Sequence, residues 1–129
     1  MDFRFWPELN EWLKAQKLFG DGDIVALAGA VKNLTQPNQP SDRDLVLRQI
    51  EISVQLHGIK KVVLINHQDC GAYGGSAAFG SLKEEFEFHK KELAKAKKTI
   101  LERFAGLLIE LVYARIDQPA DKPTFEFIG

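Results

Sequence analysis

The stretch KKVVLINHQDCGAYGG, from Lys60 to Gly75, decides the fold. It opens with a short, β-branched apolar run, which is typical of a central strand covered on both faces. The run ends abruptly in His67-Gln68-Asp69-Cys70, and a glycine-rich connection follows. Ligand sites in open α/β sheets lie beyond the carboxyl ends of the strands. We therefore expect His67 and Cys70 to lie at such a site.

Apolar runs and helical patterns alternate along the rest of the chain. Helical spacing predicts three helices, at 7–19, 41–57 and 82–104. Short apolar or alternating runs predict four strands, at 24–29, 60–66, 107–116 and 124–128. A turn is expected at 118–123. This order predicts an α/β fold with a mostly parallel central sheet flanked by helices and a C-terminal edge strand, in a single domain over residues 1–129.

The third helix carries the clearest start signal in the chain. Ser81 and Glu84 form a capping box ahead of it. An apolar stripe then recurs at helical spacing, made by Phe86, Leu93, Ala96, Ile100 and Phe104. We assign the lysines and glutamates between them, together with His89, to the solvated face. In the second helix we expect Leu45, Ile50, Ile52 and Leu56 to face the core, with Gly58 as the stop.

Composition excludes several classes of protein. The net charge of −1 offers no basic surface for nucleic acid. No run of about 18 apolar residues is present, so we expect no membrane partner. The N-terminus lacks a basic segment followed by an apolar one, and the chain holds one cysteine, which fits a reducing compartment. We therefore expect a cytoplasmic protein.

His67 and Cys70 are two of the donors that zinc prefers. Catalytic zinc takes three protein ligands and a water molecule, so a pair of donors three residues apart is half of a site. The same two residues also fit a structural role, because cysteine is commonly a small buried hydrophobe and histidine often packs. Their spacing leaves both interpretations open.

A second motif lies at the amino terminus, in MDFR. Asp2 and Arg4 are two residues apart, and on a strand that spacing puts both side chains on one face. An arginine can hold a carboxylate bidentately and keep it ionised. Taken by itself, such a pair is an ordinary surface ion pair of small energetic value.

Together these segments resemble the β-class carbonic anhydrases. That family carries C-x-D-x-R at the end of its first strand, then a GD-x-F-V-x-R-x-A-G-N strand, then a strand that ends in G-H-x-x-C-G. This chain has MDFR, GDIVALAGA and VVLINHQDCGAYGG in the same order. Its C-terminal LLIELVYARIDQPADKPTFEFIG is similar to the closing strands of the family.

The resemblance implies a reaction and a set of roles. His67 and Cys70 would be zinc ligands, and Asp2 and Arg4 would be the catalytic dyad that orients the nucleophile at the metal. The reaction would be reversible hydration of carbon dioxide to bicarbonate. The resemblance also implies a homodimer or higher oligomer, and a small apolar substrate pocket lined by Ala28, Ala72 or Tyr73.

Three departures from the family pattern qualify this expectation. The first-motif cysteine would fall one position before Met1, so we expect a domain that lacks an N-terminal strand and a zinc site whose third ligand is missing or supplied by Asp2. Asn66 stands where the family has glycine, and AGA at 28–30 replaces A-G-N. The expected arginine of that segment is missing too.

Two alternatives follow from these departures. The first is a degenerate, non-catalytic carbonic-anhydrase-like domain that binds a small anion or a protein partner. The second treats GAYGGSAAFGS, residues 71–81, as a phosphate cradle between a strand and a helix. That loop matches neither G-x-G-x-x-G nor the P-loop pattern.

Overall fold

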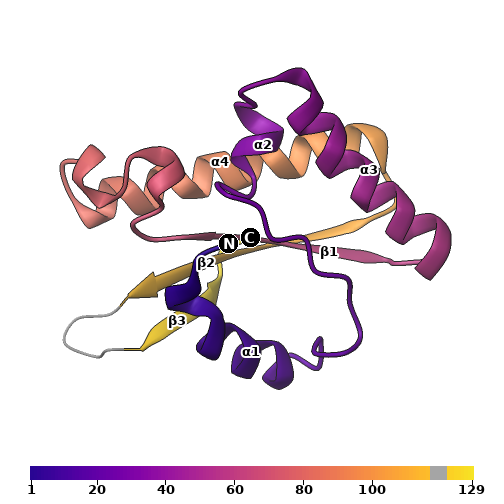
Figure 1. Ribbon diagram of the computed structural model, residues 1–129, viewed down its shortest axis with the longest axis horizontal. Helices are drawn as coiled ribbons and strands as arrows, with labels where there is room; N and C mark the ends of the chain where they lie inside the picture. The colour runs from indigo at the N-terminus through magenta and orange to yellow at the C-terminus, as the bar shows by residue number, and fades with distance from the viewer. Residues whose placement is uncertain (117–121) are drawn as a thin grey trace.

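A three-stranded sheet in the order β1-β2-β3 organises the protein (Figure 1). The computed structural model describes residues 1–116 and 122–129. Strand β1 (Lys61–His67) pairs in parallel with β2 (Leu108–Ile116), and β2 pairs antiparallel with β3 (Pro123–Phe127). The α/β class and the C-terminal edge strand are confirmed. The sheet is mixed, so the expectation of a mostly parallel sheet is not confirmed. The turn expected at 118–123 falls mainly outside the described residues.

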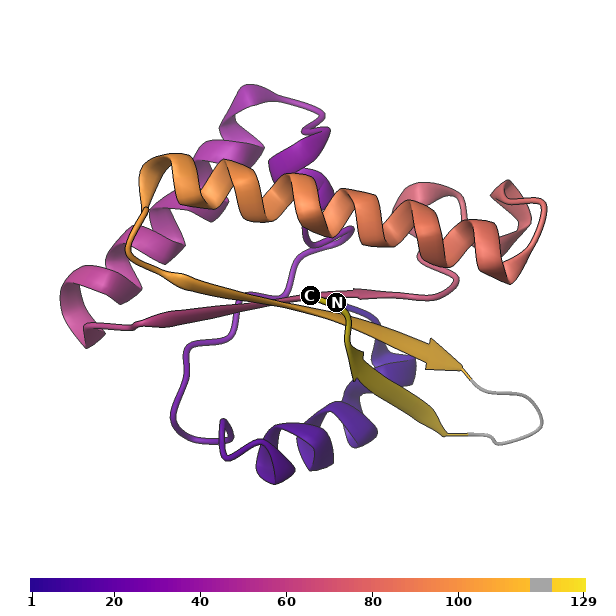
Figure 2. The same ribbon diagram turned by 180° about the vertical axis from the view of Figure 1, so that it is seen from behind.

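Helices lie on both faces of the sheet (Figures 1 and 2). One face carries three of them, α2 (Lys32–Thr35), α3 (Pro40–His57) and α4 (Leu82–Arg103). The opposite face carries α1 (Trp6–Ala15), which contacts β3. Short 3-10 turns complete the chain, η1 (Phe3–Phe5), η2 (Gly71–Tyr73) and η3 (Ser76–Ala78). No helix within the described ranges is both long and apolar enough to cross a bilayer.

Helix α4 is the crossover that a parallel β1–β2 pair requires. The Ser81 hydroxyl accepts a hydrogen bond from the Glu84 backbone N–H, as the capping box predicts. Leu93, Ala96 and Ile100 are fully buried and form the centre of the core. The predicted start and apolar stripe of this helix are therefore confirmed.

The other two long helices differ in part from the prediction. Helix α1 ends at Ala15 rather than near Phe19, because Lys17 takes a left-handed conformation with φ of +58°. Helix α3 ends at Gly58, as predicted, which caps it in the left-handed region.

The core-facing side of α3 is also different from the one predicted. Ile50 is buried as expected, but Leu45, Ile52 and Leu56 are exposed. Leu47, three residues before Ile50, completes the buried stripe instead. The sequence pattern therefore predicted the helix correctly but assigned the wrong side of it to the core.

The expected strand at 24–29 does not form. Ile24 and Val25 are 60% and 48% exposed, and residues 24–29 are outside every helix and strand of the structure. A strand forms only where a neighbour lies within hydrogen-bonding distance, and a cavity lies between this segment and β1, so no described strand pairs with that edge of β1. Strand β1 is consequently an edge strand rather than the central one that its apolar sequence predicted. The central strand is β2, where Val112 is fully buried.

Candidate functional site

Asp2 and Arg4 form a bidentate ion pair at the amino terminus. Residues 3–5 make a 3-10 turn rather than the strand expected there, and the Asp2 carboxylate caps it by accepting from the Arg4 backbone N–H at 3.0 Å. The Arg4 guanidinium donates from Nε to Asp2 Oδ1 at 3.0 Å and from Nη2 to Asp2 Oδ2 at 2.7 Å. These hydrogen bonds with Arg4 lower the pKa of Asp2 to about 2, so the carboxylate is ionised at neutral pH.

Arg4 also reaches the loop that follows β1. Its Nη1 donates to Asp69 Oδ2 at 2.7 Å, and its Nη2 donates to the Asp69 carbonyl at 3.1 Å. The hydrogen bond from Arg4 lowers the pKa of the Asp69 carboxyl as well. One guanidinium thus joins two segments that lie 65 residues apart in the sequence.

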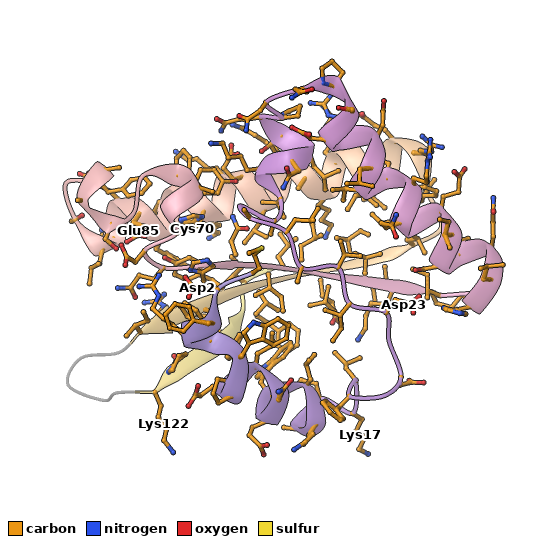
Figure 3. All side chains as sticks on the ribbon, in the orientation of Figure 1. Asp2, Lys17, Asp23, Cys70, Glu85 and Lys122 are labelled. Atoms are coloured by element: carbon orange, nitrogen blue, oxygen red, sulfur yellow. The ribbon has the colours of Figure 1, made fainter. Side chains whose placement is uncertain are left out.

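His67 ends β1 and faces this ion pair. Its Nδ1 lies 2.8 Å from the Gln68 carbonyl, which can only accept, so the proton sits on Nδ1. Its Nε2 lies 3.9 Å from Asp2 Oδ2. The structure therefore brings together the amino-terminal pair and the histidine of the central motif. Figure 3 shows Asp2 and Cys70 at the same end of the sheet.

Cys70 lies beside His67 and is buried. Burial acts to raise the pKa of the Cys70 thiol, but the neighbouring His67 imidazole and the backbone N–H groups of Ala72 and Tyr73 outweigh it and lower the pKa. For His67, burial acts to lower the pKa, while Cys70, the Gln68 backbone and Asp2 raise it. Both shifts favour a thiolate next to an imidazolium. A thiolate is the form in which cysteine is a nucleophile or a metal ligand.

Four of the predicted site residues therefore share one location: Asp2, Arg4, His67 and Cys70. Within residues 1–116 and 122–129, no group of three or more histidine, cysteine, aspartate or glutamate side chains is arranged to hold a metal ion. Both Asp2 oxygens are engaged by Arg4, which leaves the neighbouring His67 and Cys70 side chains as the two candidate donors that Arg4 does not hold.

A buried polar cluster lies behind the site, on α4. The sequence assigned His89 and Glu92 to a solvated face, and this was wrong, because both are fully buried, as is Glu85. Each has polar partners: Glu85 accepts from the Asp69 N–H at 2.6 Å and from the Ser76 hydroxyl at 2.7 Å. Their positions, four and then three residues apart, continue the apolar stripe of the helix. That spacing could have predicted from the sequence that these three residues are buried.

His89 also explains one departure from the family pattern. Asn66, which replaces the family glycine, places its Nδ2 3.0 Å from His89 Nδ1. The amide can only donate there, so the remaining His89 proton sits on Nε2, which is buried without a hydrogen-bond partner. Burial lowers the pKa of His89 to about 4, and the nearby His67 adds to this.

The residues expected to line a substrate pocket are arranged differently. Lys32 Nζ donates to the Ala72 carbonyl at 2.6 Å. The Tyr73 ring packs edge-on against Phe88 and His89, with centroids 5.3 and 5.0 Å away. The cavity that lies beside β1 is lined by none of Ala28, Ala72 and Tyr73.

The glycine-rich loop does not present free amides as a phosphate cradle would. The Ser76 N–H donates to Asp69 Oδ1 at 2.9 Å, and the Gly75 N–H donates to the Cys70 carbonyl at 3.0 Å. The Tyr73 N–H donates to the same Cys70 carbonyl. The loop amides are occupied in folding the loop around Asp69.

Comparison with known proteins agrees with this geometry. Residues 1–119 match the family described as "Putative carbonic anhydrase". The class is therefore carbonic-anhydrase-like, and the chain belongs to this family.

Two relatives come from Rickettsia. A protein of Rickettsia bellii is 33% identical over 135 residues, covering 94% of this chain and 81% of the relative. A protein of Rickettsia conorii is 31% identical over 112 residues, covering 84% of this chain but 60% of the relative. Both are described as uncharacterized. No solved structure gives a significant match.

Proposed function

We propose that the site serves reversible hydration of carbon dioxide to bicarbonate, in the manner of the β class, with zinc held by His67 and Cys70. One observation carries the proposal: the Asp2 carboxylate, fixed by Arg4, lies 3.9 Å from the ring nitrogen of His67 that is free to bind a metal. The acid, the guanidinium, the imidazole and the thiol that the reaction needs thus converge from two distant segments.

The donors present fit zinc in kind. His67 offers Nε2 because its Nδ1–H is held by a carbonyl, an arrangement that orients metal-binding histidines. Cys70 offers a thiol whose pKa is lowered. A third donor is needed, and we assign it to another chain, because Arg4 engages both Asp2 oxygens. Zinc, when bound, supplies Lewis-acid activation of water near neutral pH.

The remaining roles belong to the amino-terminal pair. Asp2 would accept a hydrogen bond from the reacting water and orient its lone pair toward carbon dioxide. Arg4 would keep Asp2 ionised and hold its orientation through the second contact with Asp69. Oligomerisation belongs to the same proposal, because the third donor is assigned to a partner chain.

Metal content and activity together test the proposal. Protein purified without chelators is expected to contain about one zinc per chain by mass spectrometry, and Cys70→Ser is expected to lose it. Stopped-flow hydration of carbon dioxide is expected to fall at least about tenfold in Asp2→Asn, which keeps its zinc. Equal rates for the wild type and Asp2→Asn would remove Asp2 from the mechanism.

One observation favours a second candidate, a non-catalytic domain. The described residues offer no group of three metal donors, and Arg4 engages both Asp2 oxygens. Protein without stoichiometric zinc and without hydration activity, but with bicarbonate binding by calorimetry that Arg4→Ala abolishes, would establish this candidate instead.

A further inference from the structure

A large apolar cavity separates β1 from the 24–29 segment, which was expected to form a strand. Its volume is about 1040 Å³. One wall is β1, with Val63 and Ile65, and the other is formed by residues 23–27 of the 23–29 segment, with Ile24 and Val25. Ile24 and Val25, which are 60% and 48% exposed, therefore face a hollow rather than a packed core.

The second wall runs along the whole of β1 and in the same direction. At its start, Asp23 accepts from the Ser53 hydroxyl at 2.7 Å and contacts His57 at 2.7 Å, close to the chain that enters β1. At its end, Gly29 packs against Ala72, just past the exit of β1. Figure 3 shows Asp23 at one end of the sheet and Cys70 at the other.

The β1 wall presents unpaired backbone groups to the cavity. Alternate residues of a parallel strand direct both backbone groups to the same neighbour. The Lys60 carbonyl and the Gln68 N–H bond β2, so the even-numbered residues between them do the same. The N–H and C=O groups of Val63 and Ile65 therefore point into the cavity, where no described strand meets them.

The opposite wall accepts a hydrogen bond from the amino terminus of the chain. The Leu27 carbonyl accepts one from the Met1 amino nitrogen at 3.0 Å. Both Met1 and Leu27 line the cavity. A polypeptide nitrogen at this end of the cavity thus bonds the wall directly.

We propose that this cavity, the strand slot, binds one extended apolar polypeptide segment of about six residues that lies parallel to β1 and completes the sheet. A strand satisfies the backbone groups of Val63 and Ile65 and buries Ile24 and Val25 at once. A lipid chain or another apolar small molecule would cover the side chains and leave those backbone groups without partners. Asp2 and His67 line one end of the slot, so its occupant is tested by the protection of the Val63 and Ile65 amides, which does not depend on activity.

Hydrogen exchange within β1 provides the first test. In dilute protein, the Val63 and Ile65 amides are expected to exchange much faster than the Val62 and Leu64 amides, which bond β2. Equal protection of all four amides at every dilution would overturn the proposal. Protection of Val63 and Ile65 that rises with protein concentration would overturn it too, in favour of a second copy of this chain as the occupant.

Added strands provide the second test. The probe is an acetylated peptide with the apolar β-strand sequence KKVVLINH, residues 60–67 of this chain. It is expected to bind and to protect the Val63 and Ile65 amides, whereas the same peptide N-methylated at alternate residues is expected not to. In the Ile24→Asp variant binding is expected to weaken at least about tenfold. The matched control is Leu56→Asp, an exposed leucine outside the slot, which should bind normally.

The same sequence can be joined directly ahead of Met1, whose nitrogen lies at the slot. This extended protein is expected to melt about 5 °C higher than an otherwise identical one with two prolines in the added strand. Failure of both the free peptide and the joined strand to protect Val63 and Ile65 would overturn the proposal. A loss of hydration activity with normal peptide binding would instead count against the proposed reaction.

Discussion

The buried carboxylate of Glu85 holds the backbone of Asp69, whose N–H donates to Glu85 Oε1 at 2.6 Å. Asp69 needs this support because it is a non-glycine residue in the left-handed region, with φ of +58°. On its other side, Asp69 accepts two hydrogen bonds from Arg4. The helix behind the sheet therefore positions the amino-terminal ion pair through one loop residue.

Replacement of Glu85 by alanine is expected to destabilise the protein by about 3 kcal/mol, because two hydrogen bonds to a charged, fully buried group are lost. Urea unfolding followed by circular dichroism measures the change. The matched control is Glu87→Ala on the exposed side of α4, which should stay within about 0.5 kcal/mol of the wild type. Similar losses for both variants would contradict the assigned support of Asp69.

The buried His89 is expected to make stability depend on pH. Its pKa is lowered from 6.5 to about 4, first by burial and then by His67, while Glu92 acts in the opposite direction. Glu85 Oε1 lies 4.0 Å from its Nε2. The unfolded chain takes up a proton below about pH 6.5, whereas folded His89 stays neutral to about pH 4. Stability from this group is therefore complete above pH 6.5 and declines by about 3 kcal/mol toward pH 4.

His89→Gln tests this expectation, because glutamine can still accept from Asn66 but does not titrate. Between pH 6.5 and pH 4, the unfolding free energy should fall about 3 kcal/mol further in the wild type than in the variant. Carboxylates with lowered pKa values, such as Asp23 and Glu92, contribute equally to both proteins. Parallel pH profiles would show that His89 does not titrate as described.

Local signals in the sequence predicted part of the fold well. The start of α4 at Ser81, the end of α3 at Gly58 and the strands β1 to β3 follow from caps, turns and apolar runs, which act within a few residues. The 24–29 segment shows the limit of such signals. Its composition is that of a buried strand, but strand formation depends on a neighbour that accepts its backbone hydrogen bonds.

The site was predictable in a different way. The convergence of Asp2 and Arg4 with His67 came from the resemblance to a family, because no local pattern links residues 65 apart. Asp69 and Glu85 were missed, since a charged residue is normally assigned to the surface. Glu85 and His89 lie on the same helical face as Leu93, and that spacing outweighs their polarity.

Arg4→Lys is expected to separate the role of the guanidinium from its charge. Lysine keeps the charge but cannot make the forked contacts with Asp2 and Asp69 at once. The kcat/KM for carbon dioxide hydration is expected to fall about tenfold. Stability should change by less than about 1 kcal/mol, because Arg4 is partly exposed. The control is Arg103→Lys, which carries a single exposed ion pair with Glu51 and should keep full activity.

Gly29 is expected to be much less replaceable than Gly58, although both lie in the left-handed region, with φ of +73° and +61°. A Cβ added at Gly58 meets nothing within 4 Å, so Gly58→Ala should lose about 1 kcal/mol to backbone strain. At Gly29 the added Cβ would lie 2.9 Å from Ala72 Cβ and 3.1 Å from Lys32 Cβ. Gly29→Ala should therefore lose about 3 kcal/mol in urea unfolding. Ala72 follows the candidate ligand Cys70 by two residues. If Gly29→Ala lost no more unfolding free energy than Gly58→Ala, the loop that carries Ala72 would have to move to make room for the added Cβ, which would contradict the rigid packing expected here.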